Sequence, residues 1–159
     1  MRSIFLLPVL LVGSFAPAAA AQGCVISGVT TLDFGQGCGF GSPPQMKIGY
    51  DAGSCALEVD ITAFGCCNYF PAGHILTLGQ ELRAPVSLPS PPFMAGCLQL
   101  ISMRERTAEQ PGLSSRYGVP QSPSLIGRTI DFQAAVRWFD TISFISDYGV
   151  TQGVHVTFY

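Results

Sequence analysis

Hydrophobic and polar residues alternate with a period of two along several short stretches of the chain, the pattern of β-strands with one buried face. The clearest stretch is ALEVDITAF, residues 56–64, which predicts a strand. Its expected inward residues are Leu57, Val59, Ile61 and Ala63, while Glu58, Asp60 and Thr62 face outward. The run MKIGY before it alternates too, and the turn-forming DAGS between them predicts a β-hairpin.

Two more alternating stretches lie in the last third of the chain. TIDFQAAVRW predicts a strand with Ile130, Phe132, Ala134, Val136 and Trp138 inward and Asp131, Gln133 and Arg137 outward. GVHVTFY places Val154, Val156 and Phe158 on one face. Shorter apolar runs lie at 75–78, 85–88 and 97–103, whereas residues 104–124 are polar, aperiodic and predicted to form a long loop.

The composition agrees with many short strands joined by tight turns. The chain has 18 Gly and 12 Pro, and only 11% of its residues are charged, against about 25% in a typical soluble protein. No amphipathic period of 3.6 residues is visible beyond the N-terminal segment. We therefore expect an all-β fold, an antiparallel, immunoglobulin-like β-sandwich with disulfides, in a single domain over residues 22–159.

The N-terminus, MRSIFLLPVLLVGSFAPAAAA, has the features of a secretory signal peptide over residues 1–21: one basic residue, an apolar run and small residues before the cut. The apolar run is too short and too interrupted by Pro8 and Pro17 to cross a membrane as a helix, and no later stretch is long enough. The sequence thus predicts a secreted, periplasmic or cell-surface protein with no transmembrane segment after signal removal. Cys24 close to the cut leaves lipidation as an alternative.

Six cysteines, an even number in an exported chain, predict three disulfides. They are Cys24, Cys38, Cys55, Cys66, Cys67 and Cys97. Adjacent residues on a strand point to opposite faces, so Cys66 and Cys67 are expected to reach two different partners and to pin one loop to two parts of the domain. Pairing of Cys97 with Cys66 or Cys67, and of Cys24 with Cys38, are the hypotheses.

Other roles for the cysteines remain as alternatives. A zinc site would use Cys66, Cys67, Cys97 and His74, although the CxxC spacing of most structural zinc sites is absent. A redox-active pair would need a neighbouring cation to lower a thiol pKa, and no lysine or histidine adjoins the pair. No metal and no cofactor are predicted.

Candidate catalytic residues are few. His74 and His155 are the only histidines, and both are expected at the surface. Glu58 and Asp60, on one strand face, would stand about 6.5 to 7 Å apart, a spacing that suits a glycosidase, a weak calcium contact or an ordinary solvated face. No Gly-x-Ser-x-Gly turn and no phosphate-binding glycine loop occurs. We expect no enzyme.

Charge excludes one class of partner. Without Arg2 the chain has seven basic and ten acidic residues and no basic cluster, so nucleic acid is not an expected partner. Tyr69, Phe70 and Phe93 lie in Gly- and Pro-rich sequence, where they are expected in loops. Exposed, they could bind a protein or a glycan at the cell surface; packed, they would only fill space around the cysteines.

Three resemblances point to the same architecture. The segments ILTLGQELRAPVSLPSPPFMAGCLQL, VPQSPSLIGRTIDFQAAV and GVHVTFY resemble small exported bacterial β-sandwich domains of unassigned activity. TTLDFG and the segments after it are similar, more weakly, to immunoglobulin-like modules of the ASPM/SPD-2/Hydin type. CVISGVTTLDFG with VHVTFY faintly resembles pilin-like domains of the spore coat U type. All three imply a sandwich, and none implies a catalytic residue.

From these observations we expect a secreted, non-catalytic binding or structural module of a bacterial surface or extracellular assembly. A carbohydrate-binding module that uses Tyr69, Phe70 and Phe93 is the first alternative, and a hydrolase is the second.

Overall fold

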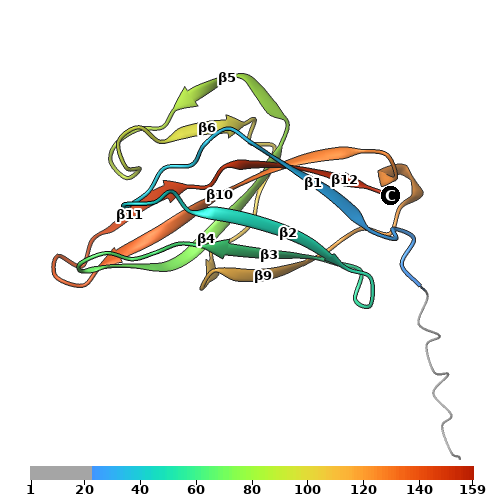
Figure 1. Cartoon of the computed structure of the whole chain (residues 1–159), viewed down its shortest axis with the longest axis horizontal. Coiled ribbons are helices and arrows are strands. Elements are labelled where there is room, and N and C mark those ends of the chain that lie inside the picture. Colours follow the sequence, from blue (N-terminus) through green and yellow to red (C-terminus); the bar gives the residue numbers. More distant parts are fainter. Residues whose placement is uncertain (1–22) are drawn as a thin grey trace, which may run out of the picture.

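Strands account for most of the described part of the chain, residues 23–159 of the computed structural model (Figure 1). The predicted signal peptide, residues 1–21, lies outside the described residues. In order the elements are β1 (Val29–Phe34), β2 (Gln45–Asp51), β3 (Ala56–Thr62), β4 (Tyr69–Gly79), β5 (Glu81–Ser87), β6 (Leu98–Ile101), β7 (Glu105–Arg106), β8 (Gln110–Pro111), β9 (Ser114–Gly118), the 3-10 helix η1 (Pro123–Leu125), β10 (Thr129–Asp140), β11 (Ser146–Val150) and β12 (Gly153–Phe158). Within residues 23–159, no helix is long and apolar enough to span a membrane.

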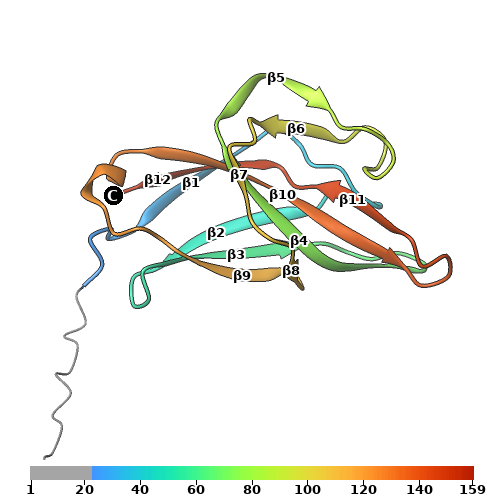
Figure 2. The same cartoon turned by 180° about the vertical axis from the view of Figure 1, so that it is seen from behind.

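Two antiparallel sheets pack together as a β-sandwich, which confirms the predicted fold class (Figure 2). The larger, seven-stranded sheet has the order β1-β12-β10-β4-β7, with β11 paired to β10 and β8 paired to β4. The smaller sheet has the order β2-β3-β9. The predicted hairpin is β2 with β3, in a register that sets Asp51 opposite Ala56 across the turn.

The core lies between these sheets, and the alternation of the sequence identifies most of it. Leu57, Val59 and Ile61 of β3 are buried, as predicted, while Ala63 is only half-buried. The buried residues on the facing sheet are Phe132, Ala134, Val136, Trp138, Val154, Val156 and Phe158. Each large side chain removed from water in this way contributes about 1.5 to 3 kcal/mol.

Gln152, just after β11, links the larger sheet to β2 of the smaller sheet. Gln152 accepts a hydrogen bond from the backbone N–H of Met46 (3.1 Å) and donates one to the carbonyl oxygen of the same residue (2.8 Å). Because Gln152 is only 4% exposed, its amide has no competing water. It therefore replaces the strand neighbour that β2 lacks at its start.

The outer face of β10 is covered by a third layer, the β5–β6 hairpin, which we call the flap (Figure 1). Gln133 accepts a hydrogen bond from the N–H of Leu100 (2.9 Å) and donates one to the carbonyl of Leu98 (3.1 Å), and Asp131 accepts one from the N–H of Glu81 (2.5 Å). Asp131 and Gln133 thus point away from the core between the two sheets, as predicted. They are not exposed to solvent, however, because the flap covers them: Asp131 is 7% exposed and Gln133 is 5% exposed.

Residues 104–124 are not the long loop that their polarity predicts. They contain β7, β8 and β9, and β9 completes the smaller sheet by pairing with β3 from Ala56 opposite Gly118 to Asp60 opposite Ser114. The strand is short and half-buried, with Ser115 and Tyr117 turned partly inward, so its pattern is too weak to stand out from a polar loop.

The disulfides differ from the predicted pairs. Cys24 bonds to Cys55 and Cys38 to Cys97, with Cα to Cα distances of 5.5 and 5.2 Å. Cys66 and Cys67 are free and exposed, so the expected fork from this pair, its link to Cys97, and the Cys24 to Cys38 link are all wrong. Sequence spacing could not show that Cys38 runs beside β11, which brings it within reach of the flap at Cys97.

The bond between Cys24 and Cys55 also bears on the lipoprotein alternative. A lipid on Cys24 would need the same Sγ atom that forms the disulfide. The bond instead ties the N-terminal segment to the turn between β2 and β3, where Cys55 adopts a positive φ of 53°.

Candidate functional site

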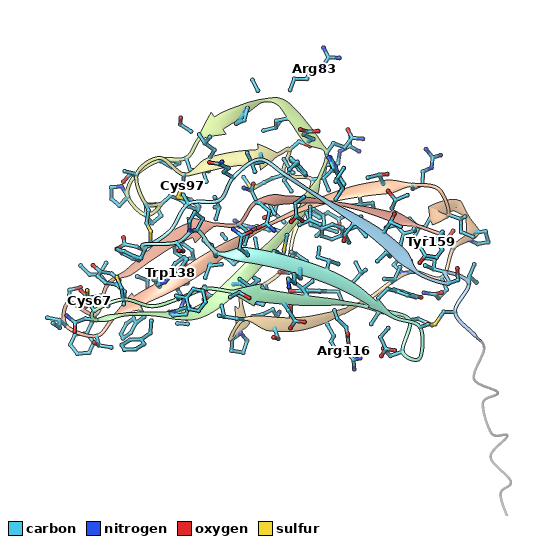
Figure 3. The ribbon with its side chains drawn as sticks, in the orientation of Figure 1. Cys67, Arg83, Cys97, Arg116, Trp138 and Tyr159 are labelled. Carbon is cyan, nitrogen blue, oxygen red and sulfur yellow. A yellow bond between two sulfur atoms is a disulfide. The ribbon has the colours of Figure 1, made fainter. Side chains whose placement is uncertain are left out.

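Two loops meet at one end of the sandwich and form an apolar exposed surface there. One is the β3–β4 loop, residues 63–68, and the other is the β10–β11 loop, residues 141–145. They are held side by side because β4 pairs with β10 up to Tyr69 opposite Asp140, and the N–H of Thr141 then donates to the carbonyl of Asn68 (3.0 Å). Cys67 marks this end of the molecule in Figure 3.

Five large apolar side chains at this end are mostly exposed, and we call them the apolar tip. They are Phe64 (67% exposed), Phe70 (55%), Ile142 (68%), Phe144 (74%) and Ile145 (60%). Scattered apolar residues are normal on a protein surface, but a group of them on two adjacent loops and the start of β4 indicates a contact surface. A soluble chain would lose little stability by having polar residues here, so folding does not account for the cluster.

Hydrogen bonds to Asp140 hold the β10–β11 loop in one conformation. Asp140 accepts hydrogen bonds from the N–H of Ile142 (2.9 Å) and the hydroxyl of Ser143 (2.5 Å), and its carbonyl accepts one from the N–H of Phe144 (2.9 Å). The Ser143 hydroxyl, followed by the Ile142 N–H, holds the pKa of the Asp140 carboxyl below its ordinary value. The loop is therefore locked by an ionised carboxylate at neutral pH.

Phe144 adopts an unusual backbone conformation. Its φ is +58°, in the left-handed region that side chains with a Cβ rarely occupy. Its ring contacts Phe139 edge to face, with 6.1 Å between ring centroids, yet Phe144 remains 74% exposed. A costly backbone conformation that presents a large apolar ring to solvent points to a functional constraint on this residue.

The free thiols belong to the same end of the molecule. Cys66 closes a tight turn in which the N–H of Tyr69 donates to the Cys66 carbonyl (2.9 Å), and Cys67 at the turn has a φ of +58°. The hydrogen bond with Cys67 raises the pKa of the Cys66 thiol, with burial as a smaller cause. Both thiols are exposed, so they are accessible to a second protein.

Charge is absent from the tip. Neither residues 63–70 nor residues 141–146 contain Asp, Glu, Lys or Arg. The nearest carboxylates in sequence are Asp140, which is buried in the loop, and Asp147. The surface thus lacks the basic residues that draw proteins to anionic lipids, and suits an uncharged apolar partner.

The three aromatic residues singled out in the sequence do not form one platform. Tyr69 and Phe70 are the first residues of β4 and not a loop; Tyr69 packs inward on Phe40, with 4.1 Å between ring centroids. Phe70 faces solvent at the tip, whereas Phe93 packs near Tyr148 and lines a groove under the flap. Sugar binding by Tyr69, Phe70 and Phe93 stays a prediction, but the three side chains do not lie on one surface where they could stack on the same sugar.

Neither histidine is the exposed residue that the sequence predicts. His74 lies within β4, fully buried, and its two ring nitrogens contact the Gly112 carbonyl (3.0 Å) and the Ser115 hydroxyl (2.9 Å). Both nitrogens are thus occupied, which leaves none for the zinc site considered above. Among residues 23–159, no three His, Cys, Asp or Glu side chains lie close enough to hold a metal ion.

His155 is partly buried on the outer face of β12. Its Nδ1 contacts Asp131 (2.8 Å), its ring stacks on Phe34, and its Nε2 faces Glu81 (3.7 Å). A hydrolase would need a nucleophile at the Nε2 atom. The Glu81 carboxylate stands there, so His155 makes a structural contact that joins β12 to the flap.

The paired carboxylates of β3 are also engaged. Glu58 and Asp51 both contact the guanidinium of Arg116 (2.6 and 2.5 Å), and Asp60 accepts a hydrogen bond from Ser114 (2.7 Å). All of these partners are exposed to solvent, as expected for a solvated strand face. The reading of Glu58 and Asp60 as an acid and base pair finds no support in this geometry.

Comparisons of the chain with protein-family models, with curated proteins and with solved structures found no match. The resemblances in the sequence therefore stay predictions, and the function has to be argued from the surface. Its strongest functional feature, the apolar tip, was missed in the sequence. The signal was visible as two turn segments, AFGCCNYF and TISFIS, that lack charge and hold five large apolar residues.

Proposed function

We propose that this protein is an exported, non-catalytic structural module that joins a second copy of itself through the apolar tip. Export is supported by the predicted signal peptide and by the two disulfides. The observation that carries the proposal is the exposure of Phe64, Phe70, Ile142, Phe144 and Ile145, which lie on two loops and at the start of β4, where backbone hydrogen bonds hold the two loops together. The immunoglobulin-like character of the sandwich belongs to the same proposal.

The size of the tip suits a contact between two copies. At about 200 Å² for a fully exposed large side chain, the five exposed fractions amount to roughly 650 Å² per copy. If all of this area is covered, two copies that meet here bury roughly 1,300 Å², at the lower end of the range of stable interfaces, about 1,200 to 2,000 Å². Single exposed residues elsewhere, such as Leu32 on β1, offer far less area.

Electrostatics favour the same partner. The chain is weakly acidic, with a formal net charge of −2, so two copies have a slight net repulsion. Residues 63–70 and 141–146 carry no charge, so the tips can approach each other without close repulsion between like charges. An apolar contact between identical surfaces also closes as a twofold dimer and does not grow into a fibre.

The exposed thiols can make this contact covalent. Cys66 or Cys67 of one copy would form a disulfide with Cys66 or Cys67 of the other. The two thiols together lose two protons and two electrons to an oxidant such as molecular oxygen or a small disulfide. The raised pKa of Cys66 makes the reaction slow for an isolated thiol, so contact of the tips, which raises the local thiol concentration, is expected to drive it.

Sedimentation equilibrium of the purified chain tests the proposal. In a Cys66→Ala/Cys67→Ala background, which keeps both structural disulfides and needs no reductant, we expect a reversible dimer, and we expect Phe144→Ser/Ile142→Ser in the same background to be a monomer over the same concentrations. The control is Leu32→Ser/Ile126→Ser, which removes two large, exposed apolar residues from other regions of the surface. It should dimerise as the wild type does.

Two outcomes would overturn the proposal. One is a wild-type chain that stays monomeric at the highest concentrations studied. The other is a dimer that persists when Phe144 and Ile142 are replaced but dissociates in the control variant. Circular dichroism would check that each variant is folded, as we expect because the replaced residues are exposed.

A further inference from the structure

A second apolar surface lies away from the tip, in a groove between the flap and the outer face of the larger sheet. Its floor comes from Ile75 of β4 and Ala135 of β10, and its wall comes from Val86, Leu88, Phe93 and Ile101. The groove has a volume of about 430 Å³, within the range of about 300 to 1,000 Å³ that is typical of small-molecule sites.

The flap stays fixed above the sheet because it is anchored on two sides. The Cys38 to Cys97 disulfide ties it beside β11, and Gln133 ties β6 to β10 through the Leu98 carbonyl and the Leu100 N–H. Gln133 also donates to the Thr151 carbonyl (3.1 Å), so its amide is fully engaged. The Gln133 amide is thus satisfied by the protein, so it does not compete with the apolar side chains beside it for contact with a ligand.

One charged residue lines the groove, at its rim. Arg106 of β7 pairs in register with Thr77 of β4, so both side chains lie on the groove side of the sheet. Within residues 23–159, Arg106 makes no ion pair, whereas Arg137 on the same face is paired with Glu109. No Asp or Glu is among the lining residues, and the adjacent Glu105 lies on the opposite face, beside Leu76 and Leu78.

From this arrangement we infer that the groove binds an amphipathic monoanion with a single unbranched alkyl chain. The chain would lie on Ile75 and Ala135 beneath the flap, and the carboxylate would accept hydrogen bonds from the Arg106 guanidinium and the Thr77 hydroxyl. A guanidinium binds a carboxylate through two parallel hydrogen bonds, which a neutral or cationic head group cannot make. The site is independent of the tip and shares no residue with it.

Isothermal titration with dodecanoate, below its micelle concentration, tests the inference. Dodecyltrimethylammonium, which has the same alkyl chain and the opposite charge, is the comparison ligand. We expect dodecanoate to bind with one site per chain and dodecyltrimethylammonium to bind at least about tenfold more weakly, since the cation cannot accept the charge-assisted hydrogen bonds of Arg106.

Two variants locate the site. Arg106→Gln removes the guanidinium from an exposed position, and we expect about a tenfold loss of dodecanoate affinity with no change for the cation. Ala135→Phe fills the floor and should abolish binding of both. Arg83→Gln is the matched control, because Arg83 is an exposed arginine of the flap that points away from the sheet, as Figure 3 shows.

The inference is overturned if dodecanoate does not bind, if the cation binds as tightly, or if Arg83→Gln weakens binding as much as Arg106→Gln. The Arg106→Gln result decides the matter even if Ala135→Phe proves unfolded. All titrations can use the Phe144→Ser/Ile142→Ser background, so that self-association at the tip does not contribute heat.

Discussion

Removal of the Cys38 to Cys97 disulfide tests how much of the fold depends on covalent anchoring of the flap. We consider Cys38→Ala/Cys97→Ala in a chain that also carries Cys66→Ala and Cys67→Ala, so that no free thiol can exchange with the remaining bond. The two cysteines are 59 residues apart, and closure of so long a loop restricts the unfolded chain strongly. The chain-entropy relation gives a loss of about 4 kcal/mol in the free energy of unfolding.

The other disulfide gives an internal comparison of that magnitude. Cys24 and Cys55 are 31 residues apart, for which the same relation gives slightly less, about 3.7 kcal/mol. The entropy contributions of the two disulfides are thus nearly equal. A clearly larger loss of stability in Cys38→Ala/Cys97→Ala would therefore show that this bond also holds the flap on the sheet. Because Cys97 is only 1% exposed, truncation there also leaves a small unfilled space, which acts in the same direction.

Urea unfolding followed by tryptophan fluorescence is the assay. Trp138 is the only tryptophan and is fully buried in the core, so its emission reports global unfolding. With a typical dependence on urea, the loss should lower the midpoint by about 2 M. The reasoning is refuted if the midpoint falls by less than a quarter of this, or if the Cys66→Ala/Cys67→Ala parent is itself as destabilised as the disulfide variant.

Three further predictions concern single side chains. Cys67→Ala removes the hydrogen bond that raises the pKa of Cys66, so the alkylation rate of Cys66 by iodoacetamide at neutral pH should rise; an unchanged or slower rate would contradict this. Asp140→Asn should lower the free energy of unfolding at pH 7. Because the Asp140 pKa is depressed in the folded state, the difference from the wild type should disappear as the pH falls below 3.8. A difference that does not depend on pH would show that the ionised carboxylate does not stabilise the loop. Gln133→Leu leaves the Leu100 N–H and two carbonyls without partners and should cost about 2 to 4 kcal/mol by urea unfolding, whereas a loss below about 1 kcal/mol would show that water replaces the amide.

Alternation in the sequence correctly predicts the apolar, buried face of a strand, but it does not predict whether the opposite, polar face is exposed or covered. It identified Phe132, Val136 and Trp138 as core, because a sheet face against a second sheet must be apolar. Asp131 and Gln133 lie on the other face of the same strand, and their polarity suggested water. The structure buries them through specific partners, Glu81 and Leu100, which lie 50 and 33 residues away in the chain and leave no local signal.

The candidate site was less predictable than the fold for a related reason. Sequence patterns indicate which residues leave the core, but not which exposed residues gather in space. Phe70 lies at the start of β4 and Phe144 in the loop after β10, far apart in the chain, and only the pairing of β4 with β10 brings them to one end. The disulfides depend on tertiary proximity in the same way, which is why an even count of cysteines predicted three bonds and two are formed.

The tip was proposed as a contact between identical chains, and isotope mixing tests this most directly. Equal amounts of unlabelled and nitrogen-15 chain, each purified as the monomer with its two structural disulfides formed, would be mixed, oxidised in air and digested under non-reducing conditions. We predict disulfide-linked peptides in which Cys66 or Cys67 from a labelled chain is joined to Cys66 or Cys67 from an unlabelled one, and their loss in Phe144→Ser/Ile142→Ser. Thiols at both positions that stay reduced, or mixed peptides formed equally well without the apolar residues, would contradict the account.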